Sequence, residues 1–290
     1  MLYGALEAGG TKMVMAIGNE QGEILDQISI PTETPQITMN TIVDYFKSKN
    51  IEALGIGSFG PIDLDKASDT YGSITSTPKL AWVNYNIVGA LKKALQIPVG
   101  FDTDVNASAL GEATWGIMKD IPSGIYITIG TGIGVGVYMN GSLLHGMLHP
   151  EAGHILLSKH PEDTFQGICP YHPNCFEGLA SGPAIEKRWK KKAIELTNNP
   201  KVWELEAYYI AQGLVDYILT LSPHRIVLGG GVMHQEQLFP LIRKEVSALL
   251  NGYIKTSQME NLDQYIVPAS LKDNQGIMGC IQLAKLALSN

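Results

Sequence analysis

A glycine pair followed by a hydroxyl and a basic side chain lies near the start of the chain, at Gly9, Gly10, Thr11 and Lys12. Adjacent glycines let backbone N–H groups approach a phosphate closely, while the threonine and lysine add a hydroxyl donor and a positive charge. The segment lacks the Gly-Lys-Ser/Thr ending of a P-loop, and an ordinary β-turn is the structural alternative. The functional interpretation is a phosphate-binding turn.

Two further glycine-rich segments follow. Residues 128–136 alternate glycine with apolar residues around Thr131 and Gly132, without the dinucleotide-binding spacing and without a predicted helix after them. This turn and the one at Gly9 to Lys12, each between two strands, would suit a site that binds a polyphosphate from both sides. The third segment follows a predicted strand and consists of Gly229, Gly230 and Gly231. It could let an adenine ring or ribose lie flat against the backbone, or it could simply form a tight strand-to-helix turn.

Asp104 follows a short predicted strand and precedes a predicted helix, in the segment Asp102-Thr103-Asp104. Side-chain oxygens at such a position can cap the helix by accepting hydrogen bonds from its first N–H groups. A carboxylate at the carboxyl edge of a sheet can equally serve as a general base, because ligand sites of α/β proteins gather there. The sequence leaves both interpretations open.

Two cysteines and two histidines indicate a metal site. Cys169, His172 and Cys175 are spaced three residues apart, and His154 lies upstream. Two thiolates and two imidazoles make a closed tetrahedral zinc site, which can staple a long loop without taking part in catalysis. The alternative is that these side chains are unconnected. The histidines that could replace His154 are His145, His149 and His160, while Cys280 is expected to be buried filler in the last helix.

Composition narrows the functional classes. The 290 residues contain 21 Lys and Arg against 28 Asp and Glu, so the net charge is 21 − 28 = −7, which disfavours binding to nucleic acids or anionic membranes. The basic run at 187–192 is therefore expected to be a solvated helix face.

Three cysteines exclude a disulfide scaffold. The start shows no secretory signal, which predicts a cytoplasmic protein. The uncharged stretch 121–150 alternates with period two and is rich in glycine, as expected of strands rather than a membrane helix.

The periodicity predicts interleaved strands and helices, which is typical of an α/β fold. Strands are expected at 2–17 (two strands around a turn), 23–30, 53–58, 99–101, 125–139 (a hairpin) and 225–228. Helices are expected at 38–49, 87–95, 106–116, 183–197, 202–221, 237–250 and 277–288. The glycine-rich hairpins near 4–17 and 125–139 echo one another, as they would in two similar halves facing each other across a cleft.

The order of these motifs along nearly the whole chain resembles the ROK family of sugar kinases, and within it the bacterial fructokinases. The segments that carry the resemblance are Glu7 to Lys12, Asp102 to Glu112, residues 128–136, Glu151 to His154, the Cys/His cluster and Leu228 to Val232. The resemblance implies an actin-like, hexokinase-type fold with two α/β domains around a cleft. An N-terminal domain of residues 1–107, joined by the last helix at 272–290, and a larger domain of residues 108–271 are expected.

The resemblance also implies roles for individual residues. Asp104 is similar to the base that takes a proton from the sugar hydroxyl. Ligands of the sugar are expected at Gly60, Glu151, His154 and Glu177, with His154 also on the zinc ion. Contacts to Mg-ATP are expected at Gly9, Gly10, Thr11, Lys12, Thr131, Gly132, Ser181, Gly229, Gly230 and Gly231.

Three departures from the family pattern favour the fructokinase branch over glucokinases. Glu7 stands where the family has Asp, Thr103 stands where many glucose-specific members have Asn, and His172 replaces part of the common Cys-x-Cys-Gly spacing. The expected reaction is ATP-dependent phosphorylation of fructose to fructose 6-phosphate, with Mg²⁺ and a structural Zn²⁺, in a homodimer. Glucokinase, mannokinase or another hexose kinase is the alternative. A non-catalytic sugar-binding regulator is a more remote alternative. A repressor is expected to carry a DNA-binding domain ahead of Glu7, for which there is no room, and a non-catalytic sugar-binding module is expected to have lost Asp104 or the phosphate-binding glycines, which are present.

Overall fold

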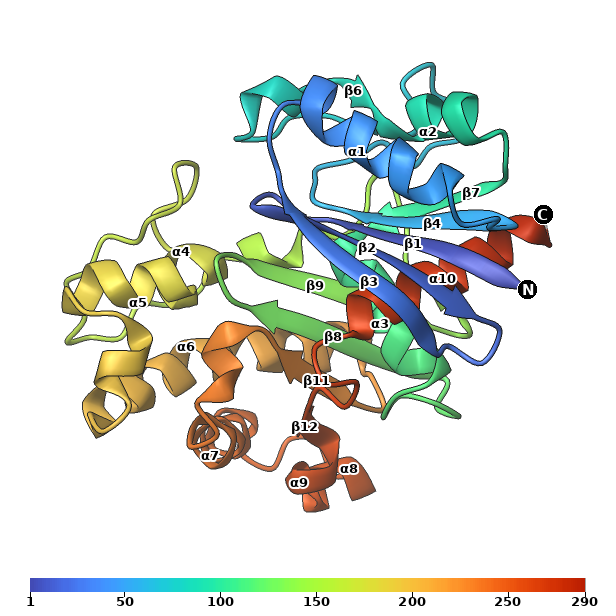
Figure 1. Cartoon of the computed structure of the whole chain (residues 1–290). Coiled ribbons are helices and arrows are strands. Elements are labelled where there is room, and N and C mark those ends of the chain that lie inside the picture. The colour runs from blue at the N-terminus through green and yellow to red at the C-terminus, as the bar shows by residue number, and fades with distance from the viewer. Residues whose placement is uncertain (290) are drawn as a thin grey trace.

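A computed structural model describes residues 1–289, and its backbone is built around two five-stranded sheets (Figure 1). The first has the strand order β3 (Ile24–Pro31), β2 (Lys12–Asn19), β1 (Leu2–Ala8), β4 (Ala53–Ser58), β7 (Val99–Thr103). The second has the order β10 (Ser142–Leu143), β9 (Ile133–Met139), β8 (Ser123–Ile129), β11 (Ile226–Gly229), β12 (Ile266–Pro268). A small additional sheet pairs β5 (Ser73–Ile74) with β6 (Tyr85–Asn86).

The two large sheets have the same topology. In each, the first two strands form an antiparallel hairpin, a third antiparallel strand lies outside it, and two later strands join the other side in parallel. The β1–β2 and β8–β9 hairpins occupy equivalent places in their sheets, which explains why the glycine-rich segments of the sequence echo one another. The structure thus confirms an α/β fold with two similar halves.

Helices cover both faces of the sheets (Figure 1). Helices α1 (Pro35–Lys47) and α2 (Ile87–Leu95) lie on the outer face of the first sheet, and α6 (Pro200–Leu221) and α7 (Leu238–Leu250) on the outer face of the second. Between the sheets lie α3 (Asp104–Thr114), which contacts β8 and β9, and α10 (Gln275–Leu288), which contacts β1 and β4. The shorter helices are α4 (Phe176–Ala180), α5 (Gly182–Trp189), α8 (Ser257–Glu260) and α9 (Leu262–Tyr265).

Glycines allow unusually close packing in the layer between the sheets. A Cβ on Gly279 of α10 would lie 1.7 Å from the carbonyl oxygen of Ala107, and one on Gly136 of β9 would lie 2.1 Å from that of Val105. Both carbonyl groups belong to α3, so any larger residue at either glycine would push α3 away from its neighbours. These contacts hold in place the helix whose first residue is Asp104.

Each half has an apolar core of its own. One cluster joins α1 and α2 to the first sheet and includes the buried Phe46 and Trp82. The other joins α6 and α7 to the second sheet and includes the buried Trp203 and Tyr209. A smaller cluster of alanine and aliphatic side chains, with Cys280 fully buried in it, joins α10 to the first sheet and α3. The expectation that Cys280 is core filler is therefore confirmed.

Most predicted elements are present, with shifted ends. Helix α1 begins at Pro35 rather than residue 38, because proline suits the first helical turn. Helix α3 begins at Asp104 rather than residue 106. The short elements α4, β12 and the β5–β6 pair lay outside the predictions.

The single helix predicted at 183–197 is wrong. Helix α5 ends at Trp189, because Lys190 adopts a left-handed conformation with φ 56°, and a separate 3-10 turn follows at Ala193–Leu196. The lysines here are good helix formers, so the sequence pattern contains no stop signal. Near this end of α5 the Arg188 side chain donates a hydrogen bond to the Leu179 carbonyl. The basic run 187–192 is consequently divided between the end of α5 and a turn.

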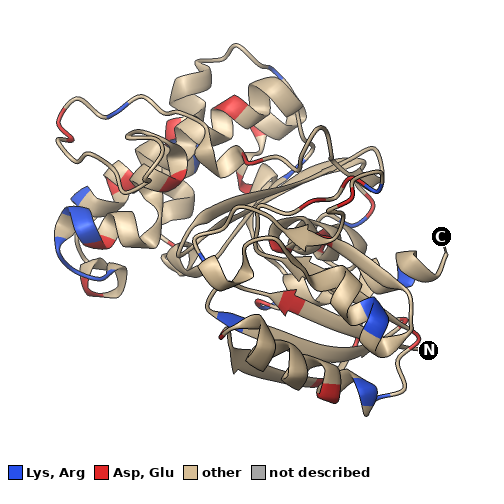
Figure 2. Cartoon of the chain, turned by 90° about the horizontal axis from the view of Figure 1, so that it is seen from above, with Lys and Arg blue, Asp and Glu red and all other residues tan. Residues whose placement is uncertain are grey.

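Acidic and basic residues are interspersed along the ribbon (Figure 2). Among residues 1–289, no helix has both the length and the apolar character needed to cross a bilayer. The division at residues 107 and 108 falls within α3, and it stays a prediction.

Candidate active site

The turn between β1 and β2 is held in a compact shape by backbone contacts. The Gly9 N–H donates to the Lys12 carbonyl at 3.0 Å, and the Thr32 hydroxyl donates to the Gly9 carbonyl at 2.7 Å. Thr11 and Lys12 are exposed. Lys79 lies over this turn, because its Cε atom is 3.7 Å from the position that a Cβ on Gly10 would occupy. The turn therefore presents backbone and two lysine side chains to one place, where an anion could bind.

Lys79 is held there by a buried tryptophan. The Trp82 indole N–H donates to the Glu33 carbonyl at 2.8 Å, and the Trp82 backbone N–H donates to the Lys79 carbonyl at 2.8 Å. The Trp82 ring is 1% exposed. No carboxylate among the described residues forms an ion pair with Lys79. Its positive charge is thus available for a ligand, and sequence patterns alone had not singled it out.

Asp104 lies where strand β7 ends and helix α3 begins. Thr103 is the helix cap, since its hydroxyl accepts a hydrogen bond from the Asn106 N–H at 3.1 Å. One oxygen of the Asp104 carboxylate accepts from the Val105 N–H at 2.9 Å. Thr103 is therefore the main capping residue, and Asp104 also binds an N–H of the first helical turn, while its role as a base stays a prediction.

The pKa of Asp104 is raised from its ordinary value to about 7. Burial is the largest cause, because it disfavours the charged carboxylate, and the negative charge of Glu7 is the second; Glu151 adds a smaller effect. Burial likewise raises the pKa values of Glu7 and Glu151. A carboxyl group with a pKa near 7 can take up and release a proton at physiological pH, which is the property that a general base needs.

Asp102 is buried beneath the site, and both of its oxygens are used. Oδ1 accepts from the Thr103 N–H at 2.8 Å and from the Asn106 side-chain amide at 2.7 Å. Oδ2 lies 2.8 Å from Nε2 of His145, which belongs to the loop after β10. Asp102 therefore fixes the start of α3 and joins it to the second half of the chain.

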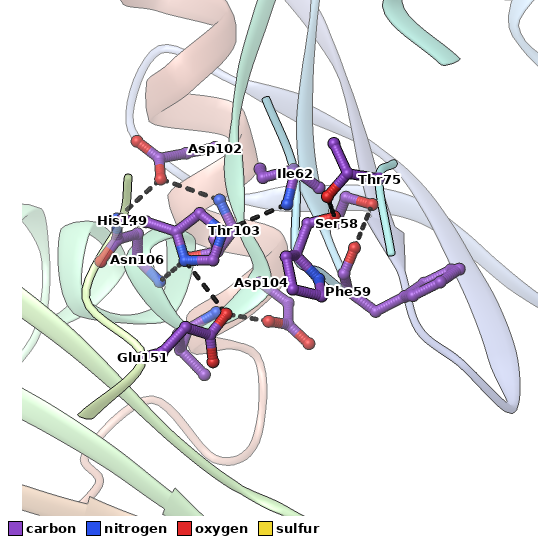
Figure 3. Close-up of polar contacts among 12 residues, drawn as sticks. Ser58, Phe59, Ile62, Thr75, Asp102, Thr103, Asp104, Asn106, His149 and Glu151 are labelled. Carbon is purple, nitrogen blue, oxygen red and sulfur yellow. Dashed lines mark hydrogen bonds and ion pairs between the residues drawn. The ribbon is translucent and has the colours of Figure 1, made fainter. Parts of the chain in front are cut away.

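Glu151 faces the same region from the second half. Its Oε1 lies 3.4 Å from Nδ1 of His149, and the Nε2 of that ring accepts a hydrogen bond from the Ile62 N–H at 3.1 Å (Figure 3). Gly60 lies beside the same ring, since a Cβ on it would be 3.5 Å from Nε2. The glutamate predicted to bind the sugar is thus close to Asp104 and Gly60, two other predicted site residues.

Glu177 joins the second glycine turn to the metal cluster. Its Oε2 accepts from the Ile133 N–H at 2.9 Å, at the turn that contains Thr131 and Gly132. Its Oε1 lies 4.0 Å from Nε2 of His154. Glu177 lies in the first turn of helix α4, which directly follows Cys175. The structure therefore places this carboxylate between the predicted phosphate turn and the predicted metal ligands.

The four predicted metal ligands converge on one point. The ligand atoms of His154, Cys169, His172 and Cys175 all lie within 4.8 Å of one another. Nδ1 of His154 is 3.6 Å from the Cys175 sulfur and 3.8 Å from the Cys169 sulfur. A tetrahedral zinc ion with Zn–S near 2.3 Å and Zn–N near 2.05 Å would separate such atoms by about 3.6 Å. The side chains consequently fit a four-coordinate metal ion.

The other histidines considered for this cluster lie elsewhere. His145 pairs with Asp102, His149 contacts Ile62 and Glu151, and the His160 ring packs edge-on against Tyr208. His154 is therefore the fourth member of the cluster. Its Nδ1 faces the sulfur atoms, which leaves Nε2 on the side of Glu177.

The three glycines after β11 differ in what surrounds them. A Cβ on Gly229 would strike the Tyr126 hydroxyl at 2.4 Å, and one on Gly230 would meet the Ile129 backbone at 2.6 Å. A Cβ on Gly231 would meet nothing within 4 Å. Gly231 is thus the position that faces open space, while the other two allow β11 and the following turn to pack against β8. All three stay predictions as adenosine contacts.

Ser181 lies at the start of helix α5, next to the second glycine turn. The N–H of the following residue, Gly182, donates to the Gly130 carbonyl at 2.8 Å. Ser181 is fully buried, and among the described residues its hydroxyl has no hydrogen-bond partner. Its predicted place near the nucleotide is compatible with this position and stays a prediction.

Comparisons with known proteins agree with these observations. The ROK family matches residues 3–287. A protein of Bacillus subtilis (strain 168) is 53% identical over 288 residues, which cover 99% of this chain and 96% of that protein. The fructokinase of Pediococcus pentosaceus is 48% identical over the full length of both chains. The solved structure of a ROK hexokinase from Thermus thermophilus has a TM-score of 0.82 and 25% identity, over 100% of this chain and 99% of that one.

Proposed function

Because this chain belongs to the ROK family, we propose that it is a sugar kinase that transfers the terminal phosphoryl group of ATP to a hydroxyl of fructose. The expected product is fructose 6-phosphate. The observation that carries the chemistry is Asp104, a carboxyl group with a pKa of about 7 at the carboxyl end of β7, between the two halves of the chain. The choice of fructose is supported by the fructokinase relatives.

Asp104 is the general base of the proposed reaction. A sugar hydroxyl is a weak nucleophile until its proton is being removed, and a well-placed base typically contributes about 10²–10⁴-fold to the rate. The hydroxyl oxygen attacks the terminal phosphorus, the bond to the ADP oxygen breaks, and the hydroxyl proton passes to Asp104. Glu151, Glu177, His154 and Gly60 are assigned to the sugar, whose hydroxyl groups can donate to the two carboxylates.

The nucleotide phosphates are assigned to the turn at Gly9 to Lys12 and to the turn containing Thr131 and Gly132. Phosphoryl transfer depends mainly on positioning and on neutralising negative charge. Lys79 lies over the first turn and supplies a positive charge there. A Mg²⁺ ion bound with ATP would supply further positive charge on the transferred phosphoryl group, and Glu7 offers the hard carboxylate oxygens that such an ion prefers. Ser181 and Gly231 are assigned to the nucleotide side, with Gly229 and Gly230 shaping the turn.

The metal held by the Cys/His cluster is proposed to be a structural Zn²⁺. Two sulfur and two nitrogen ligands in tetrahedral spacing suit zinc better than magnesium or calcium, which prefer oxygen. When bound, the ion would neutralise the thiolates of Cys169 and Cys175 and hold the long loop before α4. It would also fix the orientation of the His154 ring, so that Nε2 of His154 faces Glu177.

The family resemblance also supports proposals for the oligomeric state, the domain boundaries and the cellular location of the protein. A cytoplasmic homodimer is expected, with residues 1–107 and 272–290 as one domain and 108–271 as the other. The contacts of α10 with β1 and β4 support the assignment of the last helix to the first domain.

Release of ADP from Mg-ATP in the presence of fructose, glucose, mannose or N-acetylglucosamine tests the proposed function directly. We expect fructose to have the highest kcat/KM, by about tenfold or more. A higher value for glucose or mannose would leave the kinase chemistry intact and overturn the proposed substrate. Absence of ADP release with every sugar would overturn the kinase assignment itself.

A further inference from the structure

The arrangement around His149 joins the two halves of the chain through a single imidazole ring. Its Nε2 accepts from the backbone N–H of Ile62, which follows β4 in the first half, and its Nδ1 lies 3.4 Å from Oε1 of Glu151 in the second half (Figure 3). The ring is 5% exposed, and Glu151 lies partly in solvent, with 44% of its side chain exposed. A buried imidazole ring thus contacts the partly exposed carboxylate of Glu151.

The hydrogen-bond partners decide the state of this ring. The Ile62 N–H can only donate, so Nε2 must be the unprotonated nitrogen of a neutral imidazole, and Nδ1 must carry the hydrogen. The Nδ1–H then has two acceptors within reach, the Glu151 carboxylate at 3.4 Å and the Pro150 backbone carbonyl. A doubly protonated ring would lose the Ile62 hydrogen bond and leave a buried N–H without a partner.

We propose that His149 is a positioning residue, which as the Nδ1–H tautomer orients Glu151 toward the sugar. Because the same ring contacts Ile62, this orientation depends on where the first half of the chain lies. This inference rests on the proposed function, because it assigns Glu151 to the sugar. Glu151 binds the ligand, whereas His149 acts through Glu151. Since Ile62 and Glu151 belong to opposite halves, the carboxylate reaches its binding orientation only when the two halves are correctly placed.

The charged groups around His149 are consistent with a neutral ring. Asp102 and His145 face it from one side, at the end of β7 and in the loop after β10, and Glu151 faces it from the other. Burial is the largest effect on the pKa of His149 and lowers it; the charge of Asp102 raises it, His145 lowers it, and the Pro150 carbonyl raises it slightly. The neutral ring is therefore expected to predominate above the ordinary histidine pKa of about 6.5.

Two substitutions separate the contact of His149 with Ile62 from its contact with Glu151. In His149→Gln the amide oxygen can replace Nε2 as the acceptor for Ile62, but no donor remains for Glu151. In His149→Asn the amide nitrogen can replace Nδ1 as the donor to Glu151, but the Ile62 N–H loses its acceptor. We expect His149→Gln to raise the KM for fructose by roughly 10-fold to 100-fold, with an unchanged KM for ATP. We expect His149→Asn chiefly to lower the melting temperature.

A double-mutant cycle tests whether the effect passes through Glu151. In the Glu151→Gln background, His149→Gln should change the fructose KM less than about twofold, because the contact that it removes is already altered. His160→Gln, a matched change in a histidine that packs on Tyr208, serves as the control and should leave both KM values unchanged. Equal effects of His149→Gln and His149→Asn on the fructose KM, or full additivity in the cycle, would overturn the inference.

The wild-type protein offers a test that does not depend on the folding of any variant. Long-range ¹H–¹⁵N spectra of the histidine rings distinguish the two neutral tautomers and the protonated form. We expect one ring with hydrogen on Nδ1 between about pH 7 and pH 8, absent from the His149→Asn spectrum and shifted by fructose. An Nε2–H tautomer, or protonation in that range, would refute the proposal. Absence of fructokinase activity in the wild-type protein would instead refute the proposed function, and the tautomer result would be read separately.

Discussion

Nε2 of His145 lies 2.8 Å from Oδ2 of Asp102, and this contact joins the loop after β10 to the end of β7. The Asp102 side chain is 4% exposed, whereas His145 is 41% exposed, so the pair reaches from the core to the surface. Together with the contact between Ile62 and His149, it forms a second link between the halves of the chain. Both links lie beside Asp104.

The His145–Asp102 pair should make stability depend on pH. The hydrogen bond to Asp102 raises the pKa of His145, while partial burial opposes the shift. A raised pKa in the folded state means that the stabilisation is complete below the ordinary histidine pKa of about 6.5 and is lost as pH rises through the folded value. We expect His145→Gln to lower Tm at pH 5.5 and to have a smaller effect at pH 8.5. An equal loss of Tm at both pH values would contradict this assignment, and His160→Gln is the control.

Asp104→Asn should abolish turnover. The amide cannot accept the hydroxyl proton, so kcat should fall by at least about 10²-fold, while ATP binding measured by calorimetry should change little. Retention of more than about a tenth of the wild-type kcat would exclude Asp104 as the base. Asp104→Glu tests whether the position of the carboxylate matters in addition to its charge.

Asp104→Asn should also stabilise the folded protein at alkaline pH. The pKa of Asp104 is raised to about 7 in the folded state, so its ionisation above that pH costs stability relative to the protonated form. Asparagine resembles the protonated form and avoids that cost. We expect Asp104→Asn to raise Tm at pH 8.5, by about 2–4 °C for each kcal/mol recovered, and to raise it less at pH 5. A lower Tm at pH 8.5 would contradict this view of the site.

The dependence of kcat/KM on pH in the wild-type enzyme should reflect the ionisation of Asp104. The base must be unprotonated, so kcat/KM for fructose should fall as pH decreases below about 7. The profile of kcat/KM refers to the free enzyme, which is the state that the structure describes. A profile that stays flat down to pH 5 would argue that a group other than Asp104 accepts the proton.

Lys79→Met should impair catalysis without unfolding the chain. Lys79 is exposed, and its Cε lies 3.7 Å from the Cβ position of Gly10, so the change removes a positive charge from the proposed phosphate turn. The loss of one charge-assisted contact predicts a decrease of roughly 10-fold to 100-fold in kcat/KM for ATP. Lys66→Met, a matched change at another exposed lysine, should have no effect. Equal activity of both variants would remove Lys79 from the site.

Metal analysis should find about one equivalent of zinc per chain. The double variant Cys169→Ala/Cys175→Ala should lose it, because two of the four ligands are removed, whereas Cys280→Ala should retain it. A site filled far above its Kd stabilises the fold by about 4 kcal/mol, so removal should lower Tm by roughly 10 °C. Equal metal content in the wild-type protein and the double variant would refute the cluster.

Much of the fold follows from local patterns in the sequence. The strand at 53–58 and the helix at 87–95 have the predicted ends, because short apolar runs and helical spacing of apolar residues are local properties. The end of α5 at Trp189 was not predictable in this way. Arg188, one residue before this end, contacts Leu179 and Asp163, and neither partner is visible from the helical pattern.

The sequence by itself determined the types of site residue and their order along the chain. The phosphate turn, Asp104, Glu151 and the four metal ligands are recognisable because each depends on short spacings. Only the tertiary structure decided which of these groups meet and that Gly231 and not Gly229 is open. It also decided that Lys79 lies beside Gly10, His145 beside Asp102 and His149 beside Glu151. The physical reason is that these contacts join residues far apart in sequence. Their geometry arises when two sheets pack around α3 and α10, not from any local pattern of residues.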